Sequence, residues 1–182
     1  MGQYYQTILK DKEGKFYCYE ADWIKLTEHS WFFNPTMNAV AKKMLKKPMY
    51  VAEVGDYADE DDFNYNKEFV EKYGHIKETT VKNCNFNLFG YFLINHTKKE
   101  FLNVTKYVMN YAKNSKETDA DNLIWIIHPL PLLTAIGNGK GGGDYRGTNM
   151  EYVGIWACDL IEVSDEMPNR CEYKEILPFF EE

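Results

Sequence analysis

The chain is poor in the residues that most often carry chemistry. It has four histidines and four cysteines among 182 residues, and no two cysteines form a C-x-x-C pair. A zinc site needs clustered His, Cys or carboxylate ligands, whereas His29, His75, His96 and His128 are isolated along the chain. A Cys–His nucleophilic pair that meets only in the folded chain remains open. The sequence predicts reduced, mostly buried thiols, no metal and no cofactor.

Basic charge and long apolar runs are also scarce. Lys and Arg number 21 against 28 Asp and Glu, which leaves a net charge of −7. Such a charge repels nucleic acid and favours partners with basic grooves, so we expect no direct DNA binding. No apolar run approaches about 18 residues, and no charged segment precedes an apolar core at the N-terminus. We therefore expect a cytoplasmic protein that neither enters a membrane nor is secreted.

Aromatic residues, by contrast, are abundant. They make up 16% of the chain, which includes 14 Tyr and 11 Phe. This content excludes wholesale disorder and favours a sheet-rich core. We predict an α+β fold, a single domain over 1–182 with a mainly antiparallel sheet and helices packed on one face.

The local pattern places the elements of this fold. We predict a hairpin of two strands at 3–9 and 16–20, joined by a polar turn that contains Gly14. Helices near 36–47 and 103–113 are expected to cover one face of the sheet. The other expected features are strands at 49–54, 86–94 and 152–163, a short helix at 68–73, a buried strand or helix start at 123–127, irregular structure around Pro129 and Pro131, a mobile acidic loop at 56–66, a glycine-rich loop at 137–149 and an irregular acidic tail at 164–182.

The glycine-rich loop holds five of the twelve glycines within residues 137–143. It matches G-x-G-x-x-G, but a loop composition and not a helix follows, so the dinucleotide-binding context fails. The Walker pattern fails as well, because Gly141 follows Lys140 where Ser or Thr is required. Backbone amides in such a run can still form an anion-binding nest. Its candidate residues are Gly139, Lys140, Gly141, Gly142, Gly143 and Arg146; a plain loop is the simpler interpretation.

The densest charge of the molecule lies at 56–62. Five acids, Asp56, Asp59, Glu60, Asp61 and Asp62, surround Tyr57 and Ala58. The register of an EF-hand calcium loop is absent. A solvated loop is one interpretation, and a partner-binding surface is the other. For that surface the candidate residues are Asp56, Tyr57, Asp59, Glu60, Asp61 and Asp62.

Two more carboxylates are considered for a catalytic pair. Asp144 follows the glycine run and Asp159 follows Trp156. We favour a turn cap for Asp144 and a strand-end charge for Asp159.

Three segments resemble a family of small proteins of bacteria, phages and some fungi that has no assigned activity. They read MGQYY at 1–5, GNGKGGGD at 137–144 and VGIWACD at 153–159. The family pattern usually has Arg in place of Lys140, Gly in place of Cys158 and a basic residue in place of Leu160. VGDYAD at 54–59 and INHTKKEFL at 94–102 also look like family segments, in a different chain order from the usual one.

In length and acidity the chain also resembles the type II-A anti-CRISPR proteins, although no diagnostic motif carries this likeness. The resemblance implies a non-enzymatic inhibitor that acts in a bacterial host cell. It would bind the guide-RNA-loaded type II CRISPR effector nuclease and block recognition or cleavage of target DNA. The acids at 56–62 would then compete for Arg side chains of a basic DNA channel. The alternative is a phosphate- or nucleotide-binding protein or enzyme that uses the glycine-rich loop.

Overall fold

The N-terminal hairpin forms as the sequence predicts. The computed structural model describes residues 2–19, 25–27, 31–59, 67–81, 84–114 and 126–181. Strands β1 (Tyr5–Lys10) and β2 (Phe16–Tyr19) pair antiparallel. The amide of Asp11 donates to the Lys15 carbonyl at 3.0 Å, and Gly14 takes a φ of 86° that closes the turn.

One sheet of nine strands organises the described residues. Strand β3 (Met49–Gly55) runs antiparallel to β1 from Tyr5↔Gly55 to Lys10↔Tyr50. The order along the sheet is β4-β2-β1-β3-β8-β5-β6-β9, and β7 pairs with β3. These remaining strands are β4 (Glu78–Thr79), β5 (Phe92–Asn95), β6 (Glu100–Asn103), β7 (Ala135–Ile136), β8 (Leu160–Ser164) and β9 (Lys174–Ile176). Most pairings are antiparallel, so the predicted α+β class is confirmed.

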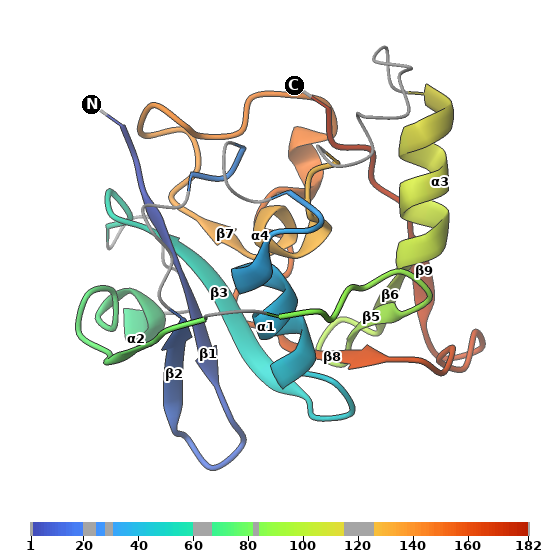
Figure 1. Cartoon of the computed structure of the whole chain (residues 1–182), viewed down its shortest axis with the longest axis horizontal. Coiled ribbons are helices and arrows are strands. Elements are labelled where there is room, and N and C mark those ends of the chain that lie inside the picture. The colour runs from blue at the N-terminus through green and yellow to red at the C-terminus, as the bar shows by residue number, and fades with distance from the viewer. Residues whose placement is uncertain are drawn as a thin grey trace.

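Three helices pack on one face of the sheet (Figure 1). Helix α1 (Pro35–Lys43) begins at Asn34, whose side chain accepts from the amide of Thr36 at 2.8 Å. Helices α3 (Val104–Asn114) and α4 (Pro129–Leu133) add Tyr107 and Leu130 to the same buried cluster. The predicted positions of α1 and α3 are thus confirmed. The four-residue helix α2 (Lys67–Val70) instead places Phe69 against the other face.

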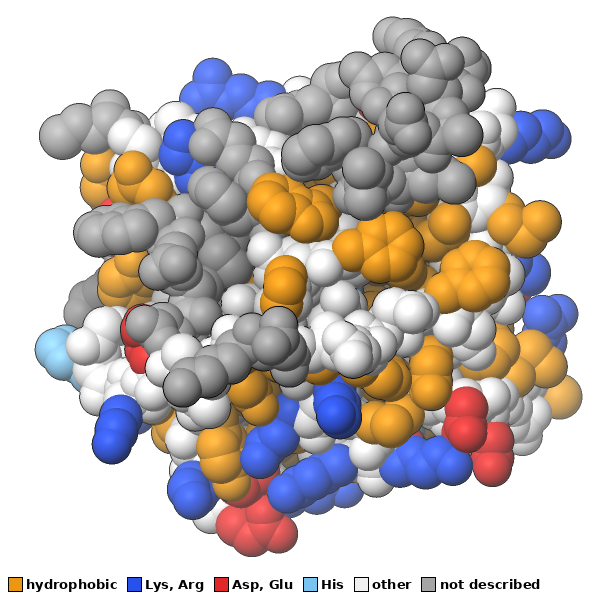
Figure 2. Space-filling view, in the orientation of Figure 1, with side chains coloured by type: hydrophobic (Ala, Val, Ile, Leu, Met, Phe, Trp, Pro, Cys, Tyr) orange, Lys and Arg blue, Asp and Glu red, His pale blue; other side chains and the backbone are white. Residues whose placement is uncertain are grey.

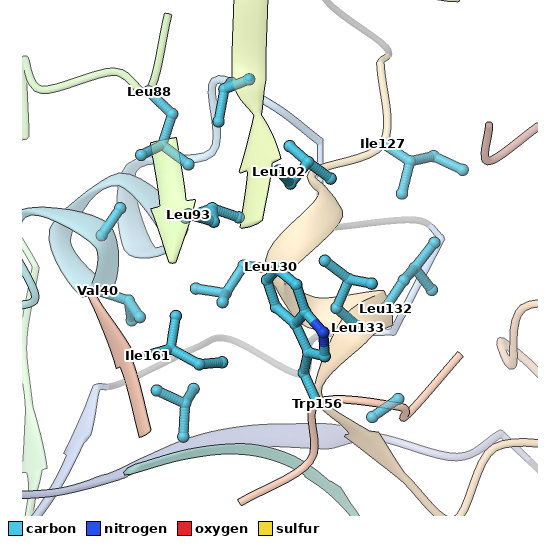
Figure 3. Close-up of a cluster of buried hydrophobic side chains, with 14 of the residues drawn as sticks. Val40, Leu88, Leu93, Leu102, Ile127, Leu130, Leu132, Leu133, Trp156 and Ile161 are labelled. Carbon is cyan, nitrogen blue, oxygen red and sulfur yellow. The ribbon is translucent and has the colours of Figure 1, made fainter. Parts of the chain in front are cut away.

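Trp156 lies at the centre of the larger hydrophobic cluster. Its side chain is fully buried among Leu130, Leu133 and Ile161 (Figure 3). The indole N–H donates to Oε2 of Glu100 at 2.7 Å, so the polar atom of the ring is satisfied in the core.

Residues 129–133 form a helix where we predicted irregular structure. The interpretation of Pro129 was wrong because proline is well suited to the first helical position, where the amide has no intrahelical acceptor. His128 caps this helix: its Nδ1 accepts from the Leu130 amide at 3.2 Å.

The strand predicted at 152–163 begins only at Leu160. A 3-10 helix occupies Met150–Tyr152, and turns follow with positive φ at Gly154 (76°) and Cys158 (60°). The amide of Trp156 donates to the Leu133 carbonyl at 2.7 Å, so this segment bonds to α4 and not to a neighbouring strand. Likewise, the strand predicted at 86–94 is confined to β5.

The tail at 164–182 is also more ordered than predicted. Strand β9 pairs parallel with β6, and the burial of Ile176 fixes it at the sheet edge. Most of the predicted element at 123–127 lies outside the described residues. Within the described part of the chain, no helix combines the length and apolarity required to cross a bilayer.

Candidate functional site

The glycine-rich loop lies against the N-terminal segment (Figure 1). The Gln3 amide donates to the Gly142 carbonyl at 2.7 Å, and the Gln3 carboxamide donates to the Gly137 carbonyl at 3.0 Å. A Cβ on Gly141 would stand 2.5 Å from Cβ of Gln3. Glycine is required there because the two backbones approach too closely for any side chain.

The loop forms a nest of amides, and the anion in that nest belongs to the chain itself. Oδ2 of Asp144 accepts from the amides of Gly139 at 2.8 Å and Gly141 at 2.7 Å. Oδ1 accepts from the phenol of Tyr5 at 2.7 Å, and Asp144 is only 3% exposed. Burial, and then the hydrogen bond to Asp144, raise the pKa of Tyr5, so the phenol remains a donor. The turn-cap interpretation of Asp144 agrees with this geometry.

The two basic candidates of the nest are engaged as well. Nζ of Lys140 forms an ion pair with Asp59 at 2.8 Å. Arg146 donates from Nη2 to the Gly141 carbonyl at 3.4 Å. Gly143 has a φ of 90° and lies against the side chain of Lys25. The six predicted anion-binding residues therefore lie together in the loop. The amides of Gly139 and Gly141 already bind the Asp144 carboxylate, and Lys140 is paired with Asp59.

The acidic turn, defined here as residues 56–59, adjoins this loop. The Asp56 amide donates to the Tyr4 carbonyl at 2.8 Å, and Oδ1 of Asp56 accepts from the Tyr4 amide at 3.1 Å. Tyr57 is half-buried, and Asp59 is exposed beside Lys140. Glu60, Asp61 and Asp62 lie outside the described residues. The described part of the predicted acidic surface thus adjoins the glycine-rich loop through the contact between Asp59 and Lys140.

A row of polar side chains lies on β1 and the segment before it, and its first two members, Gln3 and Tyr5, contact the glycine-rich loop. Gln3, Tyr5 and Thr7 stand at alternate positions and share one face. Thr7 donates to Oε2 of Glu53 at 2.6 Å. Glu53 is completely buried, and burial raises its pKa to about 7. Sequence reasoning missed this row, although its signals were present: polar residues with a period of two, and one charge inside the otherwise apolar strand at 49–55.

Asp159 belongs to a different group of contacts. Asn95 donates from Nδ2 to Oδ2 of Asp159 at 2.8 Å, and Nζ of Lys98 lies 3.9 Å away from the same oxygen. Burial raises the pKa of Asp159. Asp144 and Asp159 therefore have separate partners, as the turn-cap and strand-end interpretations anticipate.

The described histidines and cysteines form no metal-binding cluster. His128 is buried, and burial lowers its pKa to about 3. His96 lies between the Tyr173 phenol at 2.9 Å and Glu162 at 2.7 Å. Burial raises the pKa of the Cys18 thiol to about 12 and also raises that of Cys158. His75 is exposed, and His29 lies outside the described residues.

Comparisons of the chain with protein-family models, with curated proteins and with solved structures found no match.

Proposed function

We propose that this protein is a non-catalytic anti-CRISPR inhibitor that binds a guide-RNA-loaded type II CRISPR effector nuclease. The observation that carries the proposal is the fixed geometry of the acidic turn. Its first residue is bonded twice to Tyr4, and Asp59 is paired with Lys140 of the glycine-rich loop. Glu60, Asp61 and Asp62 follow in the sequence and extend the run of acids.

Anchoring matters because a partner then has less backbone freedom to remove on binding. An acidic surface complements the positively charged channel in which such a nuclease holds nucleic acid. Complementary charge accelerates encounter and suppresses wrong partners, and both effects weaken as salt rises. The net charge of −7 favours the same kind of partner.

The state of the buried reactive groups also fits a binding role. Cys18 is held as a thiol at neutral pH because burial raises its pKa to about 12. His128 is held neutral with its Nδ1 used in a helix cap. Neither group has the exposure and poised pKa that a nucleophile or a general base requires.

The test is a pull-down with guide-loaded and guide-free nuclease, followed by competition with target duplex. Neutralising Asp59, Glu60, Asp61 and Asp62 together (D59N, E60Q, D61N, D62N) should weaken binding at least tenfold and flatten its dependence on salt. The matched control neutralises four acids elsewhere, Glu13, Glu151, Glu166 and Glu172 (E13Q, E151Q, E166Q, E172Q), and should bind almost as the parent does. Binding to neither form of the nuclease would remove the proposal. An equal loss of binding in both quadruple variants would contradict a specific role for the acidic turn.

The alternative of a phosphate cradle in the glycine-rich loop has less support from the geometry, because Asp144 already accepts from Gly139 and Gly141. It predicts that nucleotides raise the melting temperature through binding to the folded state. A shift that is lost in Lys140→Gln would favour that alternative.

A further inference from the structure

A second surface of this acidic protein is basic. A hollow of about 380 Å³ lies between the second half of α1, the end of β2 and the side chains of Thr80, Val81 and Cys84. We call it the basic hollow; its lining includes Tyr19, Lys42, Lys43, Thr80 and Cys84. Figure 2 shows Lys side chains gathered over this lower part of the face, around the end of α1 and the β1–β2 hairpin.

The spacing along α1 explains how the hollow forms. Ala39, Lys42 and Lys43 stand at i, i+3 and i+4, so they share one face of the helix. The small side chain of Ala39 leaves room, and the two longer side chains border it. Such a volume matches the lower range of small-ligand pockets.

In the part of the chain that the structure describes, Lys42 and Lys43 have no carboxylate partner, whereas several other lysines do. Ion pairs at 2.7 to 3.0 Å join Lys10 to Glu68, Lys46 to Asp165, Lys106 to Glu175 and Lys140 to Asp59. Within the described residues, Lys42 and Lys43 form no such pair. Two adjacent ammonium groups without a described ion pair give this part of the surface a local positive potential.

A third lysine, Lys15, lies close to Lys43, because both contact the ring of Tyr17. Nζ of Lys43 lies 4.2 Å from the ring centroid of Tyr17, and Nζ of Lys15 lies 5.2 Å from the same ring. The nearby carboxylate of Asp11 is engaged by the Tyr17 phenol at 2.8 Å and by the Lys15 amide at 2.8 Å. The described hydrogen bonds of that carboxylate are thus with Tyr17 and Lys15, and it forms no described ion pair with Lys42 or Lys43.

We propose that the basic hollow binds the phosphate group of a small phosphorylated molecule. Lys42 and Lys43 supply the charge, and the hydroxyls of Thr80 and Tyr19 supply neutral donors. The ring of Tyr19 and the side chain of Val81 offer apolar surface to the organic part of the ligand. A polynucleotide fits less well, because the net charge of −7 repels a long polyanion.

This site uses none of the residues of the acidic turn, so the phosphate-binding proposal can be tested independently of the inhibitor proposal. A simpler interpretation is that the two lysines only complement the helix dipole. That interpretation predicts that replacing Lys42 and Lys43 lowers the stability of the fold and that the protein binds neither small probe.

The experiment is calorimetric titration of the full chain with inorganic pyrophosphate, with adenosine diphosphate and with a ten-nucleotide single-stranded DNA. We expect saturable binding of one or both small probes, and at least a tenfold loss of affinity in Lys42→Gln/Lys43→Gln. The control Lys113→Gln/Lys174→Gln removes two exposed lysines elsewhere and should bind as the parent does. Melting curves confirm that both double variants are folded.

Cys84 provides a readout confined to the hollow. In a Cys171→Ser background, which removes the exposed thiol, the bound probe should slow alkylation of Cys84 with the same midpoint as the calorimetric titration. The proposal is overturned if neither small probe binds, if only the oligonucleotide binds, if both double variants lose affinity equally, or if Cys84 is not protected.

Discussion

The Tyr5 phenol donates a 2.7 Å hydrogen bond to Oδ1 of Asp144, across 139 residues of sequence. The same carboxylate accepts the amides of Gly139 and Gly141 through its other oxygen. This one contact therefore joins the first strand of the sheet to the glycine-rich loop, and the loop in turn holds Asp59 through Lys140. The shape of the candidate surface depends on it.

Tyr5→Phe should destabilise the fold by about 2 kcal/mol, because a buried bond to a charged group is lost without a replacement. A double-mutant cycle with Asp144→Ala should give a coupling of about 1 to 3 kcal/mol, measured by denaturant unfolding. Tyr152→Phe, a half-buried tyrosine of the same cluster, is the control and should change stability little. A coupling near zero would show that the contact contributes nothing.

Gly141→Ala should cost about 3 kcal/mol, because the new Cβ would lie 2.5 Å from Cβ of Gln3 and 3.0 Å from its amide nitrogen. Gly139→Ala isolates the effect of backbone strain, since Gly139 has a φ of 102° and no atom near the position of a Cβ. We expect a smaller cost of about 1 kcal/mol there. Thermal unfolding of both variants measures the difference, and equal losses would contradict close approach as the reason for Gly141.

Glu53→Gln should stabilise the protein at pH 8. The folded pKa of Glu53 is raised to about 7 from a usual 4.5, so the unfolded chain releases this proton first as pH rises. Stability therefore falls between about pH 4.5 and 7, and the full penalty is on the order of 3 kcal/mol. From pH 4 to 8, the unfolding free energy of the parent should fall with this slope relative to that of Glu53→Gln. A parallel slope in the variant would contradict the assignment.

His128→Asn should make the protein more resistant to acid. Burial lowers the folded pKa of His128 to about 3 from 6.5, so the unfolded chain takes up the proton first as pH falls. The stability due to the neutral ring is present above pH 6.5 and is lost towards pH 3, up to the order of 5 kcal/mol. Asn retains an acceptor for the helix cap and removes the titration. The acid-unfolding midpoint should move to lower pH, and an unchanged midpoint would assign acid unfolding to other groups.

These last two slopes oppose each other. Between about pH 4.5 and 6.5 the Glu53 effect lowers stability as pH rises, whereas the His128 effect increases it. Between about pH 4.5 and 6.5, the unfolding free energy of the parent protein should accordingly change less with pH than that of Glu53→Gln or His128→Asn.

Elements with a strong local signal were predictable. Asn34 and Pro35 mark the start of α1, and Gly14 marks the turn between β1 and β2, because caps and turns are decided by neighbouring residues. The prediction at 129–133 was wrong because the suitability of proline for the first helical position was not considered. The prediction at 152–163 was wrong because that segment bonds to α4. The amides of Gly154 and Trp156 reach the carbonyls of Leu132 and Leu133, and no local pattern reports such a pairing.

The sequence alone determined the composition of the candidate site: a dense run of glycine, a dense run of acid, and too few clustered ligands for a metal. Only the tertiary structure decided that Asp59 of the acidic run pairs with Lys140 of the glycine run and that Asp144 occupies the nest of amides. The reason is physical. Glycine density shows that a backbone is free to adopt positive φ and to approach other groups closely. Which group it approaches depends on contacts such as that of Tyr5 with Asp144, and folding brings those partners together from opposite parts of the chain.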